Sequence, residues 1–229
     1  MKLFRPPILI ISLIVSMAFF SCVSNKPAQI VSLTYKLDLE ILTDTLDVRH
    51  SDYLRQKFGD SLKLYINKDG SLRFDFFGNG ANGYEYNLYN INTNHYYSKW
   101  KHLDSVYHYN VNTNTLKLSA KKILPSERIN SIDCQVIKYE ATDSLHPEYY
   151  VNQTYYYQRD SLKVESRKYK KYKEFFFYDY LSEANCWHLK KVLEMPEYRL
   201  TYSLIRINHN DKINPAKFEP PVESPLKEY

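Results

Sequence analysis

A two-residue alternation of apolar and polar side chains dominates the chain from Val31 onward and limits what it can fold into. It is clear in the segments 72–76, 84–88 and 198–204. Successive side chains of a strand point to opposite faces, so this period predicts strands with one face on a core and the other in water. Such strands are usually antiparallel. We predict further strands near residues 31–42, 61–68, 95–101, 104–110, 115–119, 132–140, 148–158 and 186–194.

A short internal repeat predicts how these strands are connected. The six residues 89–94 (YNINTN) recur almost unchanged as 109–114 (YNVNTN), 20 residues later. Asparagine tolerates positive φ and hydrogen-bonds its own backbone, so both copies favour turns. Because the interval matches two strands and their turns, both turns are expected at the same end of a meander.

Helical signals are few. Residues 51–58 (SDYLRQKF) predict one or two helical turns capped by Ser51 or Asp52. Residues 167–182 combine an aromatic run with many charges, and we expect a loop followed by a short helix there. The prolines after Asn214 predict an extended tail.

The composition excludes disorder for most of the chain, because 44% of the 229 residues are hydrophobic and 16% aromatic. The formal charge of +5 comes from 31 basic and 26 acidic residues, so the surface is of mixed sign. This balance leads us to expect no nucleic-acid partner, although lysines alternate with tyrosines over residues 168–173. A solvated loop, or contact with anionic lipid or an acidic partner, explains that segment.

The first residues resemble an export signal. Lys2 and Arg5 precede an apolar run at residues 8–20, which is too short to cross a membrane and has the length of a signal peptide's apolar segment. The run ends in Phe19-Phe20-Ser21-Cys22, which resembles the lipobox of bacterial lipoproteins, particularly the Bacteroidetes form. The resemblance implies cleavage before Cys22 and acylation (palmitate included) of Cys22, which anchors the chain to a membrane of the cell envelope. Bacteroidetes lipoproteins that reach the cell surface often carry an acidic cluster after this cysteine. None follows Cys22, so the resemblance implies the periplasmic face of the outer membrane.

The remaining cysteines, Cys134 and Cys186, have two interpretations. In an oxidising compartment they can pair as a disulfide, or they can lie apart as buried thiols. Nothing in the sequence around either thiol indicates that it is activated for catalysis.

No segment carries a recognisable catalytic, metal or cofactor motif. Residues 78–83 match G-x-G-x-x-G, but the following segment alternates as a strand, whereas a dinucleotide site needs a helix there. We interpret 78–83 as a hairpin loop. The histidines lack metal-ligand spacing, and G-x-S-x-G is missing. We therefore expect no enzyme, no cofactor and no metal.

Three features together resemble the lipoprotein-carrier superfamily (LolA/LolB-like), including the GLPGLI proteins of Bacteroidetes. These are the opening strand at 31–40 followed by a meander, the segment 128–134 (RINSIDC) that is similar to an I-x-G-x-x-C step, and the end at 198–220 with Phe218 and Pro220 or Pro221. Ser131 stands where the family usually has glycine. The resemblance implies a strongly curved antiparallel sheet, an incomplete barrel, with one or two short helices.

In that family the sheet holds apolar ligands in a hollow, so inward strand residues become candidate lining residues. They are Phe74, Phe76, Tyr84, Tyr86, Tyr202 and Leu204. The same side chains can instead fill a closed core.

Taken together, we expect a signal peptide at 1–21, a lipidated tether at 22–30, one β domain at 31–221 and an extended tail at 222–229. The expected function is that of a membrane-anchored envelope lipoprotein, without a specific role assigned, that binds a lipid-like or other apolar ligand in the hollow of its curved sheet. The alternative is an adaptor of an outer-membrane protein complex, with a protein partner in the envelope.

Overall fold

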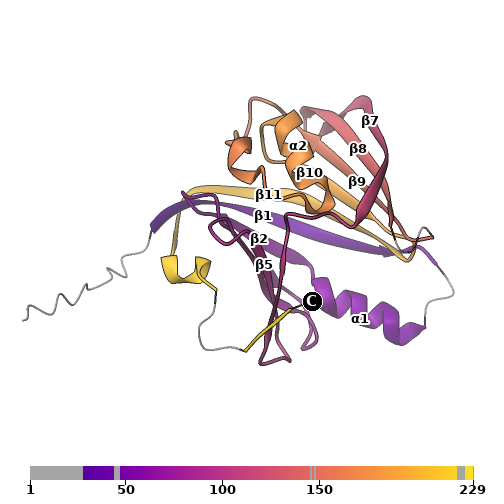
Figure 1. Cartoon of the computed structure of the whole chain (residues 1–229). Coiled ribbons are helices and arrows are strands. Elements are labelled where there is room, and N and C mark those ends of the chain that lie inside the picture. The colour runs from indigo at the N-terminus through magenta and orange to yellow at the C-terminus, as the bar shows by residue number, and fades with distance from the viewer. Residues whose placement is uncertain (1–27, 44–46, 145, 147, 221–224, 229) are drawn as a thin grey trace, which may run out of the picture.

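The computed structural model describes residues 28–43, 47–144, 146, 148–220 and 225–228, and Figure 1 shows their arrangement. Within this part, twelve strands form one sheet. The strands are β1 Ala28–Ile41, β2 Ser61–Ile66, β3 Leu72–Phe77, β4 Tyr84–Asn90, β5 His95–Trp100, β6 Val106–Asn110, β7 Leu116–Ile129, β8 Ile132–Asp143, β9 Tyr150–Tyr157, β10 Lys190–Glu194, β11 Tyr198–Ile213 and β12 Leu226–Glu228. The helices are α1 Val48–Phe58 and α2 Phe177–Ala184, with 3-10 turns η1 Ser166–Tyr169, η2 Glu174–Phe176 and η3 Pro215–Phe218.

The predicted antiparallel meander is confirmed. The strand order is β12-β6-β5-β4-β3-β2-β1-β11-β10-β9-β8-β7, and of these pairings only that of β12 with β6 is parallel. The long strand β1 lies in the middle, between β2 and β11. The order leaves β12 and β7 as open edges.

The predicted strong curvature and incomplete barrel are wrong, because the sheet is not strongly curled. Helical segments cover one of its faces. Their apolar side chains pack against the strand residues that, in a barrel, would pack against strands on the opposite side. The main core joins Leu33 and Tyr35 of β1 with Leu54 of α1 and with Tyr180 and Leu181 of α2. Burying each such side chain contributes about 1.5–3 kcal/mol.

The other face of the sheet carries two smaller clusters. In one, Phe218 of η3 packs with Ile30 and Leu88. In the other, Cys134 packs with Val136 and Tyr156. The turn η3 thus interrupts the extended tail expected after Asn214, and Asn214 caps it by accepting from the Ala216 N–H at 3.0 Å.

The two asparagine-rich turns lie together, as predicted. Asn90 accepts from the backbone of Asn92 and Thr93, and Asn110 accepts from the backbone of Asn112. The Asn94 amide donates to the Asn110 side chain at 3.2 Å, so the turns share one end of the sheet. The loop 78–83 joins β3 directly to β4, as a hairpin loop does.

Several element boundaries differ from expectation. The helix α1 begins at Val48 and is capped by Asp47, not by Ser51 or Asp52, since the Asp47 carboxylate accepts from the Arg49 N–H at 3.2 Å. The strand β1 begins at Ala28, within the expected tether. The strand β7 continues to Ile129 across two register shifts, which hide its alternation. In the expected tail, 226–228 form β12.

The loop and short helix expected over 167–182 are confirmed as η1, η2 and α2. Tyr169 and Tyr172 are buried, whereas Lys168, Lys170 and Lys171 are exposed. Three-residue spacing along the turn puts both tyrosines on the inner side. The alternation of lysine and tyrosine therefore separates the two residue types. The lysines form an exposed basic surface, and the tyrosine rings pack in the core.

Candidate functional site: an aromatic cavity beneath the helical segment

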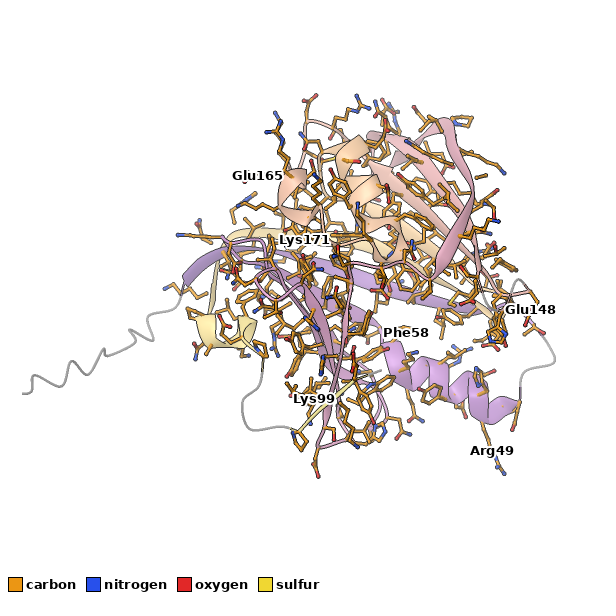
Figure 2. The ribbon with its side chains drawn as sticks, viewed as in Figure 1. Arg49, Phe58, Lys99, Glu148, Glu165 and Lys171 are labelled. Carbon is orange, nitrogen blue, oxygen red and sulfur yellow. The ribbon has the colours of Figure 1, made fainter. Side chains whose placement is uncertain are left out.

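A cavity of about 720 Å³ lies on the sheet face that carries the main core. Its walls come from β1, from β2–β6 on one side of β1 and from β9–β11 on the other, with η2 and α2 completing it. Phe58, at the C-terminal end of α1, also lines it, and Figure 2 shows this residue where the helix meets the sheet. The volume falls within the range of small-ligand pockets.

The walls are mainly aromatic. Fourteen of the described lining residues are Tyr, Phe or Trp, out of 36 such residues in the chain. Adjacent rings contact one another, as do Phe76 and Tyr84 with centroids 5.2 Å apart and Tyr96 and Tyr109 at 5.6 Å. Such contacts add about 0.5–1.5 kcal/mol each to area burial and make the walls stiff.

Four of the six predicted lining residues face this cavity. They are Phe74, Phe76, Tyr84 and Tyr202. Tyr86 does not, because a register shift between Tyr84 and Tyr86 in the pairing of β4 with β5 reverses the alternation. The Tyr86 ring instead lies on the opposite face, 3.9 Å from the Arg73 guanidinium carbon.

Leu204 is the other predicted lining residue that lies outside the cavity. It pairs with Tyr35, and its backbone N–H donates to the Leu189 carbonyl at 2.8 Å, just before β10 begins. Its side chain packs between the main core and the cluster around Cys134. Leu204 is therefore a packing residue.

One carboxylate, Glu174, is found among the described lining residues. The Tyr109 hydroxyl lies 2.8 Å from each of its oxygens and donates to them. Burial raises the pKa of Glu174 to about 7, while the Tyr109 hydrogen bond and the nearby Lys191 charge oppose that rise. Glu174 is thus partly protonated at neutral pH.

The segment that carries Glu174 has a strained backbone. The next two residues, Phe175 and Phe176, have φ values of 50° and 55°. Bulky side chains seldom adopt this left-handed region, and strain of this kind persists only where neighbouring groups hold it. Here Gln153 donates to the Phe175 carbonyl at 3.1 Å, and the Phe176 ring stacks on Tyr139 at 5.8 Å.

Lys191 of β10 is the cation deepest in the site. Its ammonium lies 5.5 Å from the ring centroid of Tyr155 and 5.4 Å from that of Tyr202. Burial lowers the pKa of Lys191 to about 8, and the charge of Glu174 opposes that fall. Among the described residues no carboxylate comes within 4 Å of this ammonium.

Three further polar side chains complete the site. Lys57 lies over the rings of Phe58 and Tyr84, at 5.2 and 5.6 Å, and burial lowers its pKa. His188 is neutral, because burial and the Lys191 charge lower its pKa to about 3. The Nδ1 atom of His188 and the Oδ1 atom of Asn87 are buried and have no hydrogen-bond partner among the described residues.

Within the described part of the chain, Cys134 and Cys186 are both free and buried, and they do not form a disulfide with each other. The reason is where the two residues lie, Cys134 on β8 and Cys186 in the segment between α2 and β10. Cys134 belongs to the cluster on one face, whereas Cys186 belongs to the main core on the other. Burial raises the pKa of Cys186 to about 11, which makes it a poor nucleophile.

The polar residues of the site, such as Glu174 and Lys191, were not predicted from the sequence. Lys190 and Lys191 are adjacent, and the sequence does not show which of them faces inward. Glu174 follows the lysine-rich run 168–173 and has the appearance of a surface residue. A wide apolar surface that surrounds a few placed polar groups is the arrangement typical of small-molecule binding sites.

Cys22, the predicted lipidation site, lies outside the described residues. Within those residues no helix is long and apolar enough to cross a membrane. No group of three or more His, Cys, Asp or Glu side chains in the described part is arranged to hold a metal ion.

Comparison with known proteins finds little similarity. No protein-family model matches the chain, and no curated protein matches its sequence. Among solved structures, the crystal structure of the Mycobacterium tuberculosis lipoprotein LppX is similar over 79% of this chain and 87% of that one. The identity is 8% and the TM-score is 0.38. At that level the likeness does not indicate a function for this chain.

Proposed function

We propose that this chain is an envelope lipoprotein, anchored through acyl chains on Cys22, that binds a lipid-like molecule in the aromatic cavity. The observation that carries the proposal is the cavity itself: about 720 Å³, with fourteen aromatic residues in its described walls. A chain whose aromatic residues only formed a core would have packed to leave few voids larger than a water molecule.

Two features of the chain favour a lipid-like ligand, one in its sequence and one in its structure. The lipobox-like residues 19–22 favour a position at a membrane, where lipid-like molecules are abundant. The cavity then offers them a surface that is apolar and shielded. The proposed function is binding without catalysis. It requires no nucleophile, no general base and no metal ion.

The test is native mass spectrometry of the full chain, extracted from membranes in a non-ionic detergent. The proposal expects an apolar molecule to remain bound to the protein after the detergent is removed in the gas phase. Recovery of the bare acylated protein alone, under conditions that preserve known lipid complexes, would contradict it.

A second candidate is the adaptor of an outer-membrane complex, and one feature favours it. The edge strand β7 is exposed along most of its 14 residues, and Leu118 and Ile123 are 44% and 66% exposed. An edge of this kind can pair with a strand of another protein. In the segment 168–173, for which contact with an acidic partner is one expectation, Tyr169 and Tyr172 are buried and cannot contribute to such a surface. In the same experiment, a co-purifying protein without bound lipid would support the adaptor.

A further inference from the structure

The position of Lys191 defines what kind of molecule the cavity accepts. Lys191 lies on β10, directly opposite Tyr155 of β9 and Tyr202 of β11, and all three side chains line the cavity. Its neighbour Lys190 points to the other face of the sheet, where its ammonium lies 4.7 Å from the Tyr156 ring. Only the first of these two lysines can reach a bound ligand.

A lysine on an inward position of an interior strand needs a partner, because burying an unpaired charge is costly. Contacts with the faces of Tyr155 and Tyr202 offset part of that cost. They leave the N–H donors of the ammonium without an acceptor, since the described part of the chain gives Lys191 no hydrogen bond and no ion pair within 4 Å. The cavity therefore contains a cation with free hydrogen-bonding capacity.

The remaining charges favour an anion at this point. The described walls hold two lysines, Lys57 and Lys191, and one carboxylate, Glu174. That carboxylate already accepts the Tyr109 hydroxyl, and burial keeps it partly protonated. His188 is neutral and adds no charge. The walls are thus positive, and an anion near Lys191 meets little repulsion.

We propose that the ligand is an amphiphile whose anionic head group, a carboxylate or a phosphate, binds the Lys191 ammonium while its apolar part lies against the aromatic walls. This inference rests on the proposed function and makes it more specific. Apolar burial supplies most of the binding free energy, and the charge-assisted hydrogen bonds to Lys191 select the head group.

The test compares probes that share one alkyl chain and differ in the head group: hexadecanoate, hexadecyl phosphate, hexadecanol and hexadecylamine. Each is added to the full-length protein in non-ionic detergent, and native mass spectrometry measures the fraction of protein that carries it. Partitioning of each probe into micelles is the same for every variant, so comparisons between variants remain valid. The two anionic probes distinguish a carboxylate from a phosphate ligand, and a preference for either supports the inference.

Three variants assign the effect to the side chain. Lys191→Met should lower retention of the anionic probes by about tenfold and leave hexadecanol unchanged. Lys191→Arg keeps the charge and should keep the preference. Lys190→Met is the matched control, from the same strand but the opposite face, and should behave as the wild-type protein does. If Lys191→Met fails to fold, Lys191→Gln takes its place.

The outcomes separate this inference from the function on which it rests. Equal retention of hexadecanol and the anions, a preference for hexadecylamine, or an unchanged preference in Lys191→Met would each overturn the anionic head group alone. Failure of every probe to bind the wild-type protein would overturn the ligand-binding function and, with it, the inference.

Discussion

The Tyr109 hydroxyl donates to the Glu174 carboxylate, at 2.8 Å from each oxygen, and joins two parts of the chain that are 65 residues apart. Tyr109 lies on β6, near one edge of the sheet, and Glu174 begins η2 in the segment that covers the cavity. The hydrogen bond thus holds that segment against the strands. It also links the closure of the cavity to the ionisation of a half-buried carboxylate.

Replacing Tyr109 with Phe should loosen this closure. The change leaves a half-buried carboxylate without its donor, so we expect the free energy of unfolding to fall by about 1–3 kcal/mol in urea denaturation. The pKa of Glu174 should rise above about 7, since the hydrogen bond favours the charged form. In a Glu174→Gln background, replacing Tyr109 with Phe should lower the free energy of unfolding by a clearly smaller amount. Equal costs in both backgrounds would show that the two side chains are not coupled.

The pH dependence of stability should carry the signature of Glu174. Its pKa is raised by burial to about 7 from 4.5, so the folded protein binds a proton that the unfolded chain has released between these values. The contribution of Glu174 to the free energy of unfolding is complete below about pH 4.5. This contribution, about 3 kcal/mol, is lost as the pH rises through about 7. Urea midpoints measured from pH 4.5 to 8 should show this loss as the difference between wild type and Glu174→Gln. Parallel profiles would contradict it.

The two buried cysteines should be unreactive in the native protein. Both thiols are free and lie on opposite faces of the sheet, and burial raises the pKa of each. Alkylation without reducing agent, read by mass spectrometry, should modify Cys134 and Cys186 only after denaturation. A peptide that cross-links the two cysteines would show that a disulfide forms.

Sequence alone predicted most of the strands and some of the site, and the failures have physical causes. The period of two located Phe74, Phe76, Tyr84 and Tyr202, because alternation follows directly from the pleat. It failed at Tyr86, where a register shift reverses the faces. Local sequence carries no sign of such a shift, which depends on the neighbouring strand.

The polar residues of the site could not be predicted from the neighbouring sequence, for a different reason. Glu174 and Lys191 are brought to one cavity by the packing of η2 against β6 and β9, which is a tertiary event. The curvature of the sheet was also mispredicted, since the helical segment that covers it is ambiguous in sequence. Charged residues in lysine-rich stretches give no indication of burial until the fold is known.

Lipidation depends on a single residue that the lipobox resemblance identifies. Replacing Cys22 with Ser should abolish palmitate labelling and move the protein from the membrane fraction to the soluble fraction. Cys134→Ala is the control, and it should retain both labelling and membrane association. Unchanged partitioning and labelling of the Cys22→Ser protein would refute the predicted anchor.

The central claim is that the cavity holds a lipid-like molecule, and narrowing it tests this most directly. Leu193 and Val192 are adjacent on β10, but Leu193 lines the cavity and Val192 packs in the cluster on the opposite face. Native mass spectrometry of membrane-extracted Leu193→Trp should show bound molecule reduced several-fold from wild type, while Val192→Trp retains it. Equal occupancy in the two variants, or none in wild type, would contradict the account.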